Sequence, residues 1–203
     1  MKKLSKDVKL HVFIDKIKES QNYDYTMFIL RDYEENSNGM LTIEEHQIGY
    51  NPDLDKKYNI QRVPTILFIN EKGNEVIRYL SAPQGSEIKP FIQALLILAG
   101  APNYYKNAIR ENINRIIPSI IKVMVTNSCA YCPQIISLVS QFALASEGKI
   151  KVVIIDITEN PDIVEKYDTS SVPFTIINDN KLLVGMYGPN ELMKILINDN
   201  IAI

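Results

Sequence analysis

Residues 125–133 read Val125-Thr126-Asn127-Ser128-Cys129-Ala130-Tyr131-Cys132-Pro133, and this stretch decides the fold of the 203-residue chain. Cys129 and Cys132 are the only cysteines in the sequence. A strand-like apolar run at 120–125 precedes them, and a helix-like run at 134–145 follows them. A Cys-x-x-Cys pair between a strand and a helix is typical of a redox-active dithiol.

The chemistry of thiols explains this placement. A thiolate is the nucleophile in disulfide exchange, whereas a free thiol near neutral pH is mostly protonated. The first turn of a helix favours the anion, because its backbone N–H groups are unpaired and the helix dipole is positive there. We therefore expect Cys129 to be the exposed, attacking cysteine. We expect Cys132, one turn further on and deeper, to resolve the mixed disulfide.

A zinc site or a purely structural pair is the alternative interpretation of the two cysteines. A closed structural zinc site needs about four protein ligands. The only histidines, His11 and His46, lie far away in the sequence, and we interpret both as ordinary structural or surface residues. The ligand count therefore argues against zinc, and we expect neither a metal nor a cofactor.

Composition limits the class of protein. Hydrophobic residues make up 46% of the chain, which suits a packed globular core, and the net charge of −2 indicates no strong attraction to nucleic acid or anionic membranes. The longest apolar run, 94–99, is too short to span a membrane. Charged residues interrupt the segment after the basic N-terminus, so no secretory signal follows. We expect a cytoplasmic protein, where a lone vicinal cysteine pair is more often catalytic than structural.

The chain contains an internal repeat. Segments 51–64 and 160–173 align without gaps at an offset of 109 (173 − 64 = 109) and share seven of fourteen residues. A repeat of about half the chain predicts two copies of one domain, which we place at 1–101 and 102–203. Each copy has the pattern β-α-β-α-β-β-α, so the predicted fold class is α/β, with a central mixed sheet flanked by helices in each unit.

The hydrophobic pattern and the turn residues predict the elements of each copy. In the first copy we expect strands at 9–14, 40–45, 65–69 and 75–79, and helices at 23–33, 52–59 and 86–98. In the second copy we expect a leading helix at 103–117, strands at 120–125, 150–157, 174–177 and 182–187, and helices at 133–145, from 161 with Asn160 as its N-cap, and at 190–199.

This order, with Cys-x-x-Cys after the first central strand of the second copy and Val-Pro before the hairpin, resembles the thioredoxin superfamily. Two tandem units are similar to the glutaredoxin-like protein disulfide oxidoreductases of archaea and some thermophilic bacteria. The resemblance implies an enzyme of the reductase or isomerase type that acts on protein thiols and disulfides. It also implies that Pro173 is cis and faces the cysteines, and that Val172 offers its main chain to an extended peptide. Tyr131 either borders this groove and contacts substrate or shields the disulfide.

The first unit departs from that pattern because it has no cysteine. The offset of 109 places Ser20 and Tyr23 at the positions of the cysteines, so we expect this unit to be non-catalytic. Pro64 remains there, either as a cis proline or as a residue that shapes a turn. This arrangement, a first unit without redox cysteines and a second unit with them, resembles the N-terminal domain of the flavin subunit of alkyl hydroperoxide reductase.

That second resemblance implies other functions. One is an electron relay from a separate thioredoxin reductase-like flavoenzyme to a peroxiredoxin, and another is a redox-sensing binding module.

The motif contains no base for Cys132, because Val123 stands where thioredoxin has a buried aspartate. We interpret Asp156, Glu147 and Glu165 as solvated or capping carboxylates rather than as catalytic groups.

Overall fold

The computed structural model describes residues 4–17, 20–167, 169 and 171–197. Sixteen elements lie in the described part of the chain. In chain order they are β1 (Val8–Ile14), α1 (Ser20–Glu35), β2 (Leu41–Gln47), α2 (Pro52–Lys57), β3 (Thr65–Ile69), β4 (Glu75–Tyr79), the 3-10 turn η1 (Gly85–Glu87), α3 (Ile88–Leu98), α4 (Lys106–Asn112), β5 (Ser119–Val125), α5 (Cys132–Ala145), β6 (Ile150–Asp156), α6 (Pro161–Tyr167), β7 (Phe174–Ile177), β8 (Lys181–Val184) and α7 (Pro189–Ile197).

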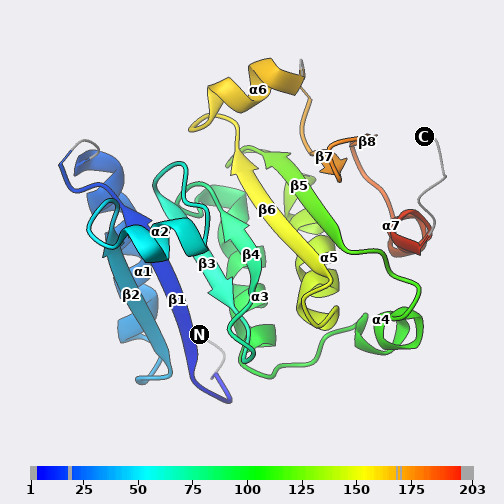
Figure 1. The fold of residues 1–203 in the computed structure, drawn as a ribbon, viewed down its shortest axis with the longest axis horizontal. Coiled ribbons are helices and arrows are strands. Elements are labelled where there is room, and N and C mark those ends of the chain that lie inside the picture. The colour runs from blue at the N-terminus through cyan, green and yellow to red at the C-terminus, as the bar shows by residue number, and fades with distance from the viewer. Residues whose placement is uncertain (1–3, 18–19, 168, 170, 198–203) are drawn as a thin grey trace.

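The eight strands form one sheet in the order β2-β1-β3-β4-β6-β5-β7-β8 (Figure 1). The first four strands have the same arrangement as the last four: β1 is parallel to β2 and antiparallel to β3, and β5 is parallel to β6 and antiparallel to β7. Parallel pairing of β4 with β6 joins the halves, with Tyr79 opposite Ile154. The predicted α/β class with two tandem thioredoxin-like units is confirmed, and the boundary after residue 101 stays a prediction.

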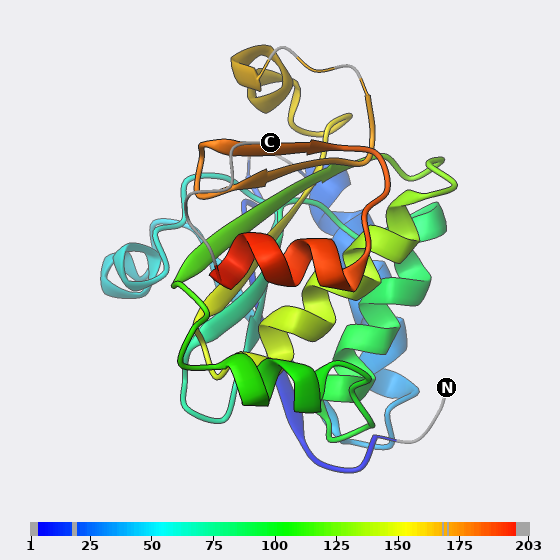
Figure 2. The same cartoon turned by 90° about the vertical axis from the view of Figure 1, so that its right-hand side faces the viewer.

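The helices cover the two faces of this sheet unequally. Helices α1, α3 and α5 lie on one face together with α4 and α7, whereas α2 and α6 lie on the other (Figure 2). The main hydrophobic core fills the first interface and includes both cysteines. Two smaller clusters lie under α6 and α2. In the described part of the chain, no helix has the length and apolar character needed to cross a lipid bilayer.

The burial of the central strands follows from their place in the sheet. In β5, Ile121, Val123 and Val125 point into the main core, whereas Met124 points into the cluster under α6. A strand that is covered on both faces needs apolar residues at consecutive positions rather than at alternate ones. This explains the apolar runs from which the strands were predicted.

Several predicted elements have different bounds. The helix expected at 103–117 is only α4, Lys106–Asn112, and residues 113–118 form a turn and an irregular segment before β5. The last strand ends at Val184 because Gly185, with a φ of 77°, turns the chain. Strand β2 extends to Gln47, so His46 lies within the strand. Residues 198 and 199 of the last predicted helix lie outside the described residues.

Equivalent asparagines of the repeat have different roles. Asn51 caps α2, since its side-chain oxygen accepts from the N–H of Leu54 at 3.2 Å. At Asn160, the expected cap of α6, the side-chain oxygen accepts from Arg62 Nη1 at 2.8 Å. Arg62 also forms a two-pronged ion pair with Asp162, at 2.8 and 3.0 Å. These contacts join the loop after α2 to the start of α6, across the two halves of the chain.

Candidate redox site

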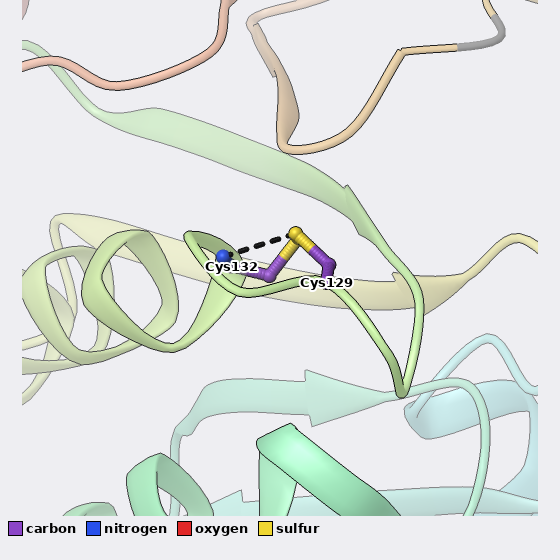
Figure 3. The surroundings of a disulfide bond; sticks show 2 residues. All are labelled: Cys129 and Cys132. Atoms are coloured by element: carbon purple, nitrogen blue, oxygen red, sulfur yellow. Dashed lines mark hydrogen bonds between the residues drawn. A yellow bond between two sulfur atoms is a disulfide. The ribbon is translucent and has the colours of Figure 1, made fainter.

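The two cysteines lie where β5 leads into α5. Cys132 is the first residue of α5, one residue earlier than predicted, and Cys129 lies in the loop before it. They form a disulfide with their Cα atoms 5.5 Å apart. The backbone N–H of Cys132 donates to Cys129 Sγ at 3.1 Å, as Figure 3 shows at the first turn of the helix. The helix N-terminus is therefore directed at the sulfur of Cys129, where it favours a thiolate.

The two sulfurs differ in access. Cys129 is 9% exposed in the disulfide form, whereas Cys132 is fully buried. Cys129 is therefore the more accessible of the two sulfurs, but it is largely buried rather than exposed as we expected from the sequence. Tyr131, between the cysteines, is 61% exposed and lies at the rim of the site. The catalytic roles of the cysteines and the substrate-binding role of Tyr131 stay predictions.

Pro173 directly precedes β7, the strand that pairs with β5. The Val172–Pro173 peptide bond is cis, as predicted. Phe174, the next residue, pairs with Met124 in the last registered pair of β5 and β7, one residue before the end of β5. Pro173 is buried, and Val172 is half-buried against the core that contains the cysteines. The roles of both residues in substrate binding stay predictions.

The first unit retains part of this arrangement. The Val63–Pro64 peptide bond is also cis, and Pro64 is buried. Helix α1 begins at Ser20, a position that the repeat offset aligns with Cys129, but the Ser20 side chain lies outside the described residues. Tyr23, aligned with Cys132, lies half-buried on α1. The cis proline is therefore present in a unit without thiols.

A buried carboxyl group near the redox loop was missed by the sequence analysis. Glu87, in η1, has no solvent exposure, and neither of its carboxyl oxygens has a hydrogen-bond partner among the described residues. Burial raises the pKa of Glu87 from 4.5 to about 8, and the nearby charge of Asp156 contributes to the rise. Burial, with a further contribution from Glu87, also raises the pKa of Tyr79. Glu87 is therefore protonated over much of the neutral range.

Glu87 comes from the first unit but lies against the second. The N–H of Ser86 donates at 2.9 Å to the carbonyl oxygen of Asn127, a residue of the redox loop. Gly85 has a φ of 49°, and a Cβ atom there would lie 2.5 Å from the same carbonyl oxygen. The turn η1 also packs against α5. The close approach requires glycine at position 85 and brings Glu87 to the segment that carries the cysteines.

The acidic residues weighed in the sequence analysis have ordinary structural roles. Glu147 forms a surface ion pair with Lys72 at 3.3 Å, and Glu165 is exposed on α6. Asp156 is buried rather than solvated, and its Oδ1 accepts from the N–H of Thr158 at 2.8 Å in the turn after β6. The prediction that these three residues have no catalytic role stays a prediction. Among the acids, Glu87 has the burial and unpaired oxygens of a proton-exchanging group.

Two thioredoxin-like units that share one sheet, with a Cys-x-x-Cys disulfide at the start of a helix, define a thioredoxin-type disulfide oxidoreductase fold. The thioredoxin domain family matches residues 120–197. The structure is similar to that of the protein disulfide oxidoreductase from Aeropyrum pernix K1, with a TM-score of 0.85 and 27% identity over 95% of this chain and 85% of that chain.

The structure is equally similar to the NTD_N/C domain of the alkyl hydroperoxide reductase AhpF from Enterococcus faecalis V583. That match has a TM-score of 0.85 and 20% identity over 96% of this chain and 92% of that chain. A comparison with curated proteins gives no match. The resemblance to tandem thioredoxin-fold disulfide oxidoreductases is confirmed, and the fold together with the Cys-x-x-Cys pair supports a redox enzyme.

Proposed function

We propose that the protein is a thiol–disulfide oxidoreductase that acts on protein disulfides through the Cys129–Cys132 couple. The observation that carries this proposal is the asymmetry of the two sulfurs. Cys129 is the more accessible sulfur and accepts the N–H of Cys132 at 3.1 Å, whereas Cys132 is enclosed. Nucleophilic attack requires an accessible thiolate, and resolution requires a second thiol close to the first.

The reduced protein transfers two electrons in two exchange steps. The Cys129 thiolate attacks one sulfur of a substrate disulfide, so that a mixed disulfide forms and the other substrate sulfur leaves as a thiolate and takes up a proton. Cys132 then loses its proton and attacks Cys129 Sγ. The Cys129–Cys132 disulfide re-forms and the second substrate thiol is released. The same steps in reverse oxidise a substrate dithiol.

The ionised form of Glu87 is the proton acceptor for Cys132 in the resolving step. With a pKa of about 8 the carboxyl group is mostly protonated near pH 7, so only its ionised fraction acts as the base there. A buried thiol cannot lose its proton to bulk water easily, and the redox motif itself has no base. With a pKa of about 8, the Glu87 carboxyl group is close to an ordinary cysteine in acidity, so a proton can pass between the two at little cost. The position of η1 against the redox loop and α5 supports this role.

The substrate polypeptide lies along Val172, with Pro173 and Tyr131 at the borders of the site. An extended peptide can pair with the main chain of the residue before a β-strand, as an added strand does. The exposed ring of Tyr131 offers an apolar surface with a polar tip beside the reactive sulfur.

Replacement of each cysteine by serine tests the proposal. Cys129→Ser should abolish reduction of a protein disulfide such as that of insulin, because the more accessible of the two thiols is removed. Cys132→Ser should accumulate a mixed disulfide through Cys129, detectable by mass spectrometry and released by dithiothreitol. Turnover by Cys129→Ser would contradict the assignment. The assignment would be supported if the Cys132→Ser variant accumulates a mixed disulfide through Cys129 and the Cys129→Ser variant is inactive.

A second candidate function is the electron relay. The confinement of the cysteines to the second unit favours it, because the first unit is then free to serve as a docking platform. A relay should be reduced rapidly by a thioredoxin reductase-like flavoenzyme, pass electrons to a peroxiredoxin and act poorly on misfolded proteins. Oxidation-dependent capture of a partner without turnover would instead indicate a redox-sensing binding module.

A further inference from the structure

A cluster of potential metal ligands lies in the first unit, on strands β1 and β2. The parallel register pairs His11 with Glu44 and Phe13 with His46. Paired residues of neighbouring strands point to the same face, as do residues two apart on one strand. His11, Glu44 and His46 therefore share one face of the sheet. The ring of Tyr58, which ends α2, lies 5.6 Å from the His11 ring, so this is the face that α2 covers.

The donor atoms of the cluster converge. His11 Nδ1 lies 2.8 Å from His46 Nε2 and 3.3 Å from Glu44 Oε2. One ligand atom from each of the three residues lies within 4.8 Å of the other two. The two imidazole rings are stacked, with their centroids 5.0 Å apart. Two imidazole nitrogens and one carboxylate oxygen thus lie close enough together for one ion to reach all three.

The surroundings hold these side chains in place. The ring of Phe13 contacts His46, with centroids 4.9 Å apart, and Tyr58 contacts His11. The His11 side chain is only 14% exposed and that of Glu44 is 34% exposed. The cluster is therefore partly enclosed by aromatic rings but can still be reached from solvent, as an ion-binding site requires.

We propose that His11, His46 and Glu44 bind one divalent transition-metal ion of the class of Zn²⁺ or Co²⁺. Imidazole suits Zn²⁺ and its neighbours in the first transition row, and a carboxylate completes a three-ligand set of the type found in zinc proteins. Three protein ligands leave a fourth tetrahedral position for water or an external ligand. The ion links the edge strand β2 to β1.

The geometry needs only a small adjustment to hold the ion. Zinc–nitrogen bonds of about 2.0–2.1 Å in a tetrahedral site place two nitrogens about 3.3 Å apart. His11 Nδ1 and His46 Nε2 would have to separate by roughly half an ångström from their hydrogen-bonded distance. Lys9 forms an ion pair with Glu44, and the ion would displace this ammonium group from the carboxylate.

Metal titration of the untagged, oxidised chain tests the proposal. The disulfide keeps Cys129 and Cys132 from acting as ligands, so bound metal reports on other sites. After chelator treatment, Co²⁺ should bind at one ion per chain with d–d absorption in the visible range, and Zn²⁺ should displace it. Zn²⁺ should also raise the melting temperature, because a ligand that binds only the folded state stabilises it.

Matched variants localise the site. His11→Gln and His46→Gln should weaken Co²⁺ binding by at least about tenfold, since even outer-shell changes cost about 10–100-fold. Glu44→Gln should weaken it as well, whereas Glu45→Gln should not. Glu45 is the next residue of β2 but pairs with Lys16 and Arg31.

The result can also overturn the proposal. Failure of the native chain to bind Co²⁺ or Zn²⁺ at one ion per chain would do so. The proposal would also be wrong if the native protein and both histidine variants bound Co²⁺ with equal affinity. An equal loss of Co²⁺ affinity in Glu44→Gln and Glu45→Gln would contradict it as well. Circular dichroism of each variant shows that it is folded. If His11→Gln is unfolded, His46→Gln and Glu44→Gln decide the question.

Discussion

At the scale of single residues, Glu87 should make the stability of the protein depend on pH. Its carboxyl pKa is about 8 in the folded protein against an ordinary 4.5. Between these values the folded state keeps the proton and the unfolded chain loses it, so stability falls as pH rises. The contribution is fully present below about pH 4.5 and is lost by about pH 8, and it amounts to roughly 3–5 kcal/mol at most. Glu87→Gln should flatten this slope in urea unfolding at several pH values.

An exposed acid provides the control for Glu87. Glu147→Gln removes a surface carboxylate and should leave the slope unchanged, because an exposed ion pair contributes little. If both variants keep the native slope, Glu87 does not titrate in this range. The proposed proton transfer adds a kinetic measurement: Glu87→Gln should slow disulfide closure by Cys132 about a hundredfold near pH 7. The deficit should shrink above about pH 9, where a thiol ionises without help.

Residue-level reasoning from the sequence could find the cysteines but not Glu87. The Cys-x-x-Cys spacing identifies its own chemistry, and the Val-Pro pairs could be recognised from the repeat. An acid at the start of a helix, by contrast, is usually a solvent-facing residue that interacts with the helix dipole. Helix α5 of the second unit packs against the turn that carries Glu87, and no local sequence pattern predicts that contact. The same holds for His11 and His46, which are 35 residues apart and meet only through strand pairing.

At the scale of elements, the turn η1 should control the position of the redox loop. Gly85→Ala places a methyl group 2.5 Å from the carbonyl oxygen of Asn127, so either η1 or the loop must move. Gly73 provides the control, because it also has a positive φ, 78°, but nothing lies within 4 Å of its added Cβ. Both substitutions should cost about 1–2 kcal/mol for the left-handed backbone.

The two glycine variants should therefore differ in two measurements. Gly85→Ala should lower the melting temperature more than Gly73→Ala and should also slow disulfide exchange, whereas Gly73→Ala should leave exchange unchanged. Equal losses of stability with normal exchange in both would show that the contact between η1 and Asn127 does not position the loop.

The elements themselves were largely predictable, and the exceptions have local causes. Apolar runs located β3 and β5 to within a residue, because strands covered on both faces are largely apolar, and the turn at 70–74 located β4. The leading helix of the second unit was predicted too long, since only Lys106–Asn112 is helical and the chain turns at 113–115. Strand β2 was predicted to end too early, at residue 45, because its last residues are polar. The packing of His46 against Phe13 cannot be inferred from hydropathy.

At the scale of the whole molecule, the sequence repeat predicts two units but not how they join. The matching segments 51–64 and 160–173 show that one fold occurs twice. The parallel pairing of β4 with β6 has no sequence signature, because any exposed strand edge offers the same N–H and C=O groups. The shared core, with Phe91 of α3 and Val139 of α5 in one cluster, follows from that pairing.

Because the units share a sheet and a core, we expect the chain to unfold as one cooperative body. Leu67→Ala tests this, since Leu67 is fully buried in the small cluster under α2, within the first unit. Truncating a buried leucine costs about 2–5 kcal/mol. In a single cooperative transition, the slowest-exchanging amides of α5 and β6 in the second unit should lose the same free energy of opening as those of β1 and β3. Hydrogen exchange followed by mass spectrometry measures both sets in one experiment. Unchanged protection of α5 and β6 would mean that the second unit, with its cysteines, remains folded when the first unit opens.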